Sequence, residues 1–177
     1  PNKNKAGMEI YLCFFQHLLY SQKDDGKAAI VVPTGFITAK SGIAYKIRKH
    51  LVDGEKSILR GVVSMPSNIF ANTGTNVSVV FIDKSGVDKP VLIDASKLGE
   101  TIKDNGIQKT KLRAEEIDKI VETFRNKEAL EDFSVTPSFD EIKEKGYSFS
   151  AGQYFDIKID YVDITEEEFK ARITSFR

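Results

Sequence analysis

Residues 59–84 constrain the fold of this chain more than any other segment. They read LRGVVSMPSNIFANTGTNVSVVFIDK, in which two apolar runs, residues 60–65 and 77–83, flank a loop rich in Pro, Asn, Thr and Gly. Each run has the length and the β-branched content of a strand. The loop, residues 66–76, is too short for a helical crossover, which normally takes a dozen or more residues. We therefore predict that strand 77–83 runs antiparallel to the strand before it.

The neighbouring segments place this strand pair in an α/β domain. Residues 7–20 carry apolar side chains at helical spacing, and we expect a helix whose wide apolar face is buried in a large core. Residues 28–32 form a continuous apolar run that is typical of a strand covered on both faces. A second helix is expected at residues 41–52, and a further strand at residues 91–93. The order helix, strand, helix, strand, strand predicts an α/β fold.

The character of the sequence changes near residue 100. Residues 99–112 are polar, and we expect a loop there. An amphipathic helix should follow, and the capping-box patterns at residues 138–141 and 165–168 predict two more helix starts. The two predicted regions are residues 1–100, an α/β domain, and residues 101–177, a mainly helical extension.

Charge and composition exclude few classes of function. The 177 residues have zero net charge, but residues 1–60 carry 10 basic and 5 acidic side chains, whereas residues 101–177 carry 13 and 17. No basic patch stands out, so the charge neither favours nor excludes a nucleic-acid ligand. No apolar run reaches the roughly 18 residues that span a bilayer, and the single cysteine excludes a disulfide framework within the chain. We expect a cytoplasmic protein with no membrane partner. Because the chain begins with Pro1 rather than Met, we also expect a piece of a longer protein.

The usual residues of catalytic and metal sites occur here in structural settings. His17 lies in the first predicted helix, His50 ends the second, and Cys13 is expected to be a small buried side chain. The sequence contains no Gly-rich phosphate loop and no His, Cys and Asp cluster with metal-ligand spacing. We predict no metal site and no catalytic residue in this chain.

The loop at residues 66–76 is the strongest candidate for a binding site. Its Pro, Asn, Thr and Gly residues are common in simple connections, but eleven residues exceed what two adjacent strands need. The loop also places Ile69 and Phe70 where no core position is evident. The residues alone leave two interpretations of Phe70 open, a packing anchor or a side chain that stacks on a ligand.

Four segments, taken together, resemble one known family. They are VVPTGF at 31–36, IRKHL at 47–51, GVVSMPSNIFANTGTNVSVVFIDK at 61–84 and VLIDASKLG at 91–99. The later LRAEEIDKIV, EDFSV and YSFSAGQYFDI segments are similar to the C-terminal region of the same family. The family is the modification subunit of type I restriction-modification systems, an adenine-specific DNA methyltransferase that uses S-adenosylmethionine.

The resemblance implies that the chain forms the second half of a Rossmann-like methyltransferase sheet with an antiparallel last strand, followed by a mainly helical C-terminal tail. The cofactor motif of the family and its catalytic Asn-Pro-Pro-Tyr/Phe tetrapeptide are both absent from these residues. We therefore expect the isolated chain to be inactive, with S-adenosylmethionine bound mainly by residues that precede it in the full subunit.

The family also implies roles for the loop residues. Adenine must leave the duplex stack before its amino group can be methylated. In related methyltransferases an aromatic residue before the antiparallel strand stacks on the flipped base, and Phe70 matches that position. Weaker candidates for contacts to the base or its phosphates are Asn72, Thr73 and Asn76, and the residues expected to line the same pocket are Pro33, Thr34 and Gly35.

The implied partners are DNA, a specificity subunit and, in some systems, an endonuclease subunit. Residues 101–177 either contact the specificity subunit or the rest of the methyltransferase, or pack back on their own sheet. Two other functions stay open: a protein–protein assembly module, and a methyltransferase of the same fold that acts on RNA or protein.

Overall fold

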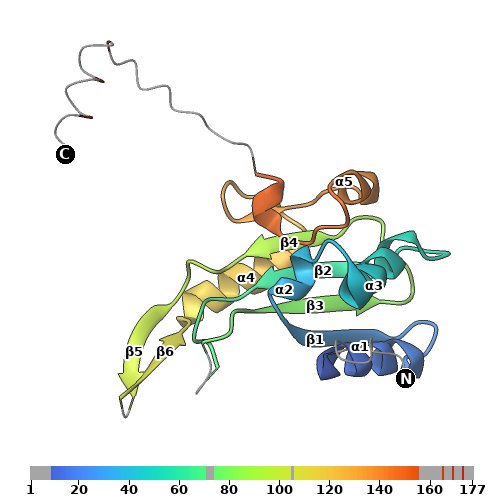
Figure 1. Ribbon diagram of the computed structural model, residues 1–177, viewed down its shortest axis with the longest axis horizontal. Coiled ribbons are helices and arrows are strands. Elements are labelled where there is room, and N and C mark those ends of the chain that lie inside the picture. Colours follow the sequence, from blue (N-terminus) through green and yellow to red (C-terminus); the bar gives the residue numbers. More distant parts are fainter. Residues whose placement is uncertain are drawn as a thin grey trace.

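The computed structural model describes residues 9–70, 74–104 and 106–155, together with residues 165, 169 and 173. Its elements in chain order are α1 (Ile10–Ser21), β1 (Lys27–Pro33), α2 (Gly35–Thr38), α3 (Gly42–Asp53), β2 (Leu59–Ser64), β3 (Val77–Asp83), β4 (Val91–Asp94), β5 (Glu100–Asp104), β6 (Ile107–Lys111), α4 (Ala114–Asn126), β7 (Ser134–Val135), α5 (Phe139–Glu144) and a 3₁₀ turn, η2 (Ala151–Gln153). The α/β class and the main predicted helices and strands are confirmed (Figure 1).

Five strands form the main sheet in the order β1-β3-β2-β4-β7. Strand β3 runs antiparallel to β1 and to β2, as the short loop before it predicts. Strand β2 is parallel to β4, and β7 closes the other edge antiparallel to β4. Strands β1, β2 and β4 therefore run in the same direction, and β3 lies between β1 and β2 and runs in the opposite direction.

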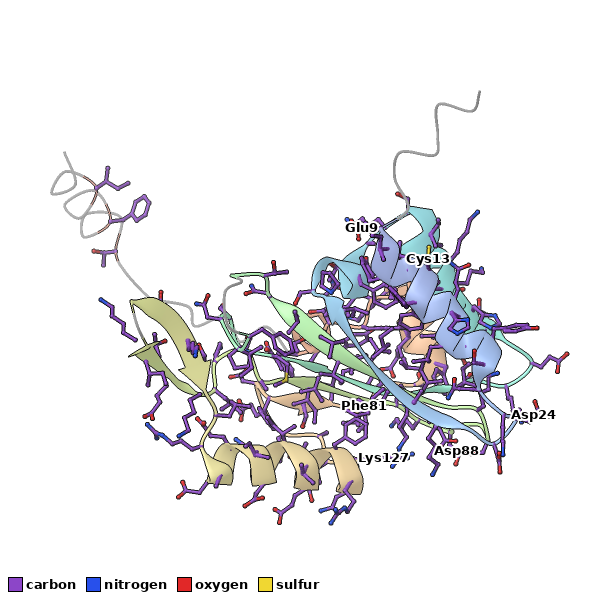
Figure 2. All side chains as sticks on the ribbon, turned by 90° about the horizontal axis from the view of Figure 1, so that it is seen from below. Glu9, Cys13, Asp24, Phe81, Asp88 and Lys127 are labelled. Atoms are coloured by element: carbon purple, nitrogen blue, oxygen red, sulfur yellow. The ribbon has the colours of Figure 1, made fainter. Side chains whose placement is uncertain are left out.

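Helices cover the two faces of this sheet unequally. Helices α1 and α3 lie on one face and α4 lies on the other (Figure 2). The larger core cluster joins α1, α2, α3 and α5 to the first face, while a smaller cluster joins α4 to the second face around Val63 and Ile93. Successive residues of β2 face opposite sides of the sheet, so Val62 belongs to the larger cluster and Val63 to the smaller.

The expectation of a strand covered on both faces at residues 28–32 is wrong. Burial alternates along β1, and the Val31 side chain is 44% exposed. Strand β1 is an edge strand whose only partner among the described residues is β3, and α4 packs against β4 rather than β1. A continuous apolar run does not reveal whether both faces are covered.

Helix α1 is less buried than its apolar pattern predicts. Leu12 and Phe15 are buried, but Phe14 is 64% exposed, and Cys13 is exposed rather than buried as expected. Because α1 packs beside the edge strand β1, only one stripe of the helix meets the core.

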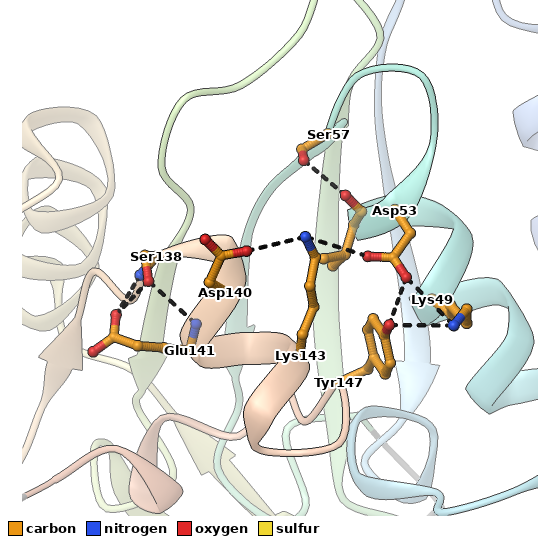
Figure 3. Close-up of polar contacts among 9 residues, drawn as sticks. Lys49, Asp53, Ser57, Ser138, Asp140, Glu141, Lys143 and Tyr147 are labelled. Carbon is orange, nitrogen blue, oxygen red and sulfur yellow. Dashed lines mark hydrogen bonds and ion pairs between the residues drawn. The ribbon is translucent and has the colours of Figure 1, made fainter.

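The described residues beyond 100 share the core of the preceding region and do not form a separate one. Ile142, Phe149 and Ala151 belong to the same cluster as Phe15 and Leu51, and β7 is part of the main sheet. The predicted loop at residues 99–112 is wrong, because β5 and β6 pair there as an antiparallel hairpin. The predicted helix start at 138 is confirmed by the reciprocal bonds of Ser138 and Glu141 (Figure 3). Most of the last predicted helix, from residue 165, lies outside the described residues.

The most buried charge in the structure is Arg48 of α3, whose side chain is 0% exposed. Its Nε donates to the Tyr147 carbonyl at 2.7 Å, and its other nitrogens donate to the carbonyls of Phe36 and Ala39. Burial lowers the pKa of Arg48 to about 10, so the guanidinium is still charged at neutral pH. One side chain thereby ties α3 to the segment that follows β1 and to the segment that follows α5.

A polar cluster fixes the Tyr147 segment from its other side (Figure 3). The Tyr147 hydroxyl donates to Asp53 Oδ2, and the Asp53 carboxylate also pairs with Lys49 at 3.5 Å and Lys143 at 3.7 Å. The backbone of Tyr147 has φ 58°, a region that aromatic residues rarely adopt, so these contacts hold a strained conformation.

We expect Arg48→Met to lower the free energy of unfolding by about 3 to 5 kcal/mol, because three buried carbonyls lose a charged donor at once. Urea unfolding at pH 7 measures this loss. The matched control is Lys46→Met on the same helix, where the exposed side chain should change stability by less than about 0.5 kcal/mol. A loss below about 1 kcal/mol for Arg48→Met would contradict the role given to the guanidinium.

The Asp53 cluster predicts an acid-sensitive contribution to stability. Burial raises the pKa of Asp53, but the hydrogen bonds from Tyr147 and Lys49 outweigh this effect and hold the pKa below its usual value. A lowered pKa stabilises the fold above the ordinary carboxyl pKa near 4 and loses that stabilisation as the pH falls through the folded value. Urea midpoints from pH 6 to pH 2.5 should therefore fall less steeply in Asp53→Asn than in the unaltered chain. Parallel curves would show that Asp53 contributes nothing.

Candidate functional site

Three chain segments leave the main sheet at the same edge. Strands β1, β2 and β4 are parallel to one another, so their carboxyl ends coincide, and the register aligns Pro33 with Val77, Ser64 with Ser78 and Ser64 with Asp94. The segments that follow are residues 34–39, the loop at residues 65–76 and the β5–β6 hairpin. Ligands in open α/β sheets bind beside such carboxyl ends.

The structure brings Pro33, Thr34, Gly35 and Asn76 together at this edge. The Thr34 amide donates to the Asn76 carbonyl at 2.9 Å, and the Thr34 Oγ1 lies 3.4 Å from the Oγ of the buried Ser78. Gly35 begins α2, where a Cβ would meet no atom within 4 Å, so neither space nor backbone angle requires glycine there.

The loop between β2 and β3 is held at both ends, and Phe70 is exposed within it. The Met65 amide continues the ladder by donating to the Val77 carbonyl at 2.9 Å, and Pro66 is buried. Asn68 adopts a left-handed φ of 55°, which asparagine tolerates better than most residues. Phe70 follows with 47% of its side chain exposed and belongs to neither core cluster. The predicted contact residues Asn72 and Thr73 lie outside the described residues.

The hairpin β5–β6 is the part of this edge that the sequence interpretation missed. The Thr110 amide donates to the Asn68 carbonyl at 2.9 Å, which joins β6 to the loop two residues before Phe70. The signal that could have predicted the hairpin is Asp104-Asn105-Gly106, since Asn-Gly between two extended runs is typical of a tight hairpin turn.

The groups supplied by residues 33–35 and by the loop after β2 are an aromatic ring, hydroxyls, side-chain amides and backbone donors. Such groups stack on planar ligands and hydrogen-bond to them, but they exchange no proton near neutral pH. The hollow of about 610 Å³ beside His50 lies at the opposite end of the strands. The arrangement is an open wall suited to binding a flat, polar-edged ligand.

Comparison with known proteins identifies the family. Residues 1–160 match the family model described as N-6 DNA methylase. The chain belongs to this family. This match, together with the type I methylase subunits described below, confirms the resemblance to the modification subunit of type I restriction-modification systems, and DNA N6-methylation is the activity that the family name states.

Relatives and solved structures agree with the family. The methylase subunit of the type I restriction enzyme MpnII from Mycoplasma pneumoniae is 30% identical over 143 residues, which cover 81% of this chain and 25% of that protein. A type I methyltransferase subunit from Streptococcus thermophilus matches with a TM-score of 0.72 and 29% identity, over 84% of this chain and 31% of that one. A modification subunit of a putative type I restriction enzyme from Vibrio vulnificus shares the fold, with a TM-score of 0.56 and 23% identity over 79% of this chain and 30% of that one.

This chain therefore spans about a quarter to a third of the length of the relatives that it matches. Within the described ranges, no helix combines the length and apolar character that crossing a bilayer requires. Within the same ranges, no group of three His, Cys, Asp or Glu side chains is arranged to hold a metal ion.

Proposed function

We propose that this chain is part of a type I modification subunit that transfers a methyl group from S-adenosylmethionine to N6 of adenine in DNA. The observation that carries the proposal is the match of residues 1–160 to the N-6 DNA methylase family, combined with an exposed aromatic at the carboxyl edge of the sheet. The full activity belongs to a longer protein, because the relatives are three to four times as long as the part that this chain matches.

The unpaired edge of the sheet at β1 supports the proposal that this chain supplies only half of the catalytic domain. No described residue pairs with the outer edge of β1, although Val31 and the apolar side chains of α1 lie exposed beside it. A Rossmann-like sheet would continue from that edge with strands that precede this chain in the full subunit. Residues 1–100 would then supply strands of the catalytic domain, and residues 101–177 would supply its C-terminal extension and contacts to a specificity subunit.

Phe70 is the proposed platform for the flipped adenine. A base stacked on an aromatic side chain gains about 1 to 3 kcal/mol, and the exposed Phe70 ring has no core contact to lose. Asn72, Thr73 and Asn76 are proposed to contact the base or its phosphates. Pro33, Thr34 and Gly35 complete this wall of the pocket, held to the loop by the Thr34 to Asn76 hydrogen bond.

We expect Phe70→Ala to lower methyl transfer by about 10- to 100-fold in the full methyltransferase, since about 1 to 3 kcal/mol of stacking is lost. With 2-aminopurine at the target position, the fluorescence rise that reports base flipping should fall, while S-adenosylmethionine affinity stays within about twofold. Ile117→Ala, at an apolar position of α4 that is 46% exposed, is the control and should leave flipping unchanged. Loss of cofactor binding in Phe70→Ala would contradict the stacking role.

The 177-residue chain by itself should transfer no methyl group. It contains no Asn-Pro-Pro-Tyr/Phe tetrapeptide and no glycine-rich cofactor motif, so neither the adenine amino group nor the methyl donor has its main binding residues. Incubation of the purified chain with tritiated S-adenosylmethionine and unmethylated DNA should leave the DNA unlabelled. Labelling above a protein-free blank would show that the missing motifs are replaced within these residues.

An assembly role is the second candidate function. Phe169 and Ile173 are about half exposed, and these apolar positions near the C-terminus would suit a subunit interface. Phe70→Ala distinguishes the base-stacking role from the assembly role. If the loop is a subunit interface, the variant should lose binding to the specificity or endonuclease subunit and keep base flipping. A methyltransferase acting on RNA or protein would instead label those substrates and leave DNA unlabelled.

A further inference from the structure

The β5–β6 hairpin is a two-stranded ribbon that stands apart from the main sheet. Its strands pair only with each other, from Glu100 opposite Lys111 to Asp104 opposite Ile107. Figure 1 shows the ribbon projecting from the end of the sheet at which β4 ends. An isolated two-stranded hairpin is marginally stable in water, so its position depends on how it is anchored.

The root of the hairpin is held by one carboxylate. Glu116, in the first turn of α4, accepts a hydrogen bond from the Gly99 amide at 2.9 Å and another from the Arg113 amide at 2.8 Å. These two backbone bonds hold the pKa of Glu116 below its usual value. Gly99 has φ +85°, and a Cβ there would lie 2.7 Å from the Thr110 side chain, so the root also requires glycine. The hairpin leaves the body of the protein in a defined direction.

The hairpin is also joined to the proposed base-binding loop. The Thr110 amide of β6 donates directly to the carbonyl of Asn68, which lies in the loop two residues before Phe70. Neighbouring extended segments joined in this way lie about 5 Å apart, which is within the reach of a lysine side chain. Lys111 directly follows Thr110, so this part of the hairpin lies next to the loop that carries Phe70.

The charge of the hairpin contrasts with the segment that follows it. Residues 100–113 carry four basic and two acidic side chains, and one of the acids, Glu100, pairs with Arg113 at 3.3 Å. Residues 114–155 carry five basic and ten acidic side chains. Lys103 and Lys111 are exposed. Their register puts them on opposite faces of the ribbon, three residues or about 10 Å apart along it, which is the rise of about three base steps.

We propose that the β5–β6 hairpin is a DNA-contacting arm that lies along a groove beside the flipped adenine and contacts phosphates through Lys103 and Lys111. The major groove admits a two-stranded ribbon, and exposed lysines on such a ribbon carry the charge that phosphates attract. This inference rests on the proposed function, because Phe70 locates the arm on the DNA. It adds a duplex-binding element that is separate from the base pocket.

The test measures binding of the 177-residue chain to a fluorescein-labelled 20-base-pair duplex, by anisotropy, from about 50 to 200 mM KCl. Lys103→Gln/Lys111→Gln should weaken binding about 10-fold or more near 0.1 M salt and reduce the slope of log K against log salt by about 2. The matched control is Lys23→Gln/Lys46→Gln, which removes the same charge from exposed positions in the turn before β1 and in α3. The control should stay within about twofold of the unaltered chain, and circular dichroism should be the same for all three proteins.

Three results would overturn the arm: no binding by the unaltered chain at 50 mM KCl, equal losses in the two double variants, or an unchanged slope in the hairpin variant. Normal DNA binding by the hairpin variant with lost capture of a specificity subunit would also overturn it and assign the ribbon to a protein partner. The measurement is independent of methyl transfer. If the hairpin variant has a reduced slope but the full subunit does not methylate adenine, the DNA-contacting arm is supported and the proposed function is contradicted. If the slope is unchanged and the full subunit methylates adenine, only the arm is contradicted.

Discussion

The carboxyl edge of the sheet depends on one buried guanidinium. Arg48 has no carboxylate partner among the described residues and instead donates to carbonyls of Phe36, Ala39 and Tyr147. The two carbonyls that follow β1 belong to the short segment that begins with Thr34, whose amide holds the loop at Asn76. Burying a charge is costly unless it is hydrogen-bonded, and each of the three guanidinium nitrogens donates to one of these carbonyls. The same bonds therefore stabilise the core and hold the wall on which the site is built.

The site combines a rigid frame with exposed contact groups. Its frame consists of ladder and backbone bonds, such as Met65 to Val77 and Thr110 to Asn68, which leave little freedom at the ends of the loop. Phe70 is exposed between these anchors, outside both core clusters. Methylation of an amino group requires that the base be oriented and its amino group be held, more than it requires an acid or a base. A wall of aromatic, amide and hydroxyl groups is consistent with that requirement.

Much of the fold follows from local pattern, whereas the missed features depend on contacts between distant residues. The short loop after β2 was enough to predict an antiparallel β3, and Ser138 with Glu141 was enough to predict the start of α5. The burial of Arg48 was not predictable from its helix, because one of its acceptors lies 99 residues away, at Tyr147. The hairpin was missed because its strands are polar on both faces and show no apolar alternation. At the candidate site, Phe70 and Thr34 stay predictions from the sequence, which gave no sign that β6 bonds to the loop at Asn68.

The carboxyl ends of the strands and the β1 edge of the sheet differ in a way that bears on how the proposed longer subunit would be assembled. At the carboxyl edge, polar groups meet partners from within the chain, as Thr34 meets Asn76 and Glu116 meets Gly99. At β1 the opposite holds, because Val31 and Phe14 are exposed apolar groups beside a strand with an unpaired edge. Exposed strand edges and apolar side chains favour association, whereas satisfied polar loops do not. In the subunit proposed above, joining another part of the protein along β1 would bury the first surface and leave the second open to a ligand, so assembly and binding would use different sides of the same sheet.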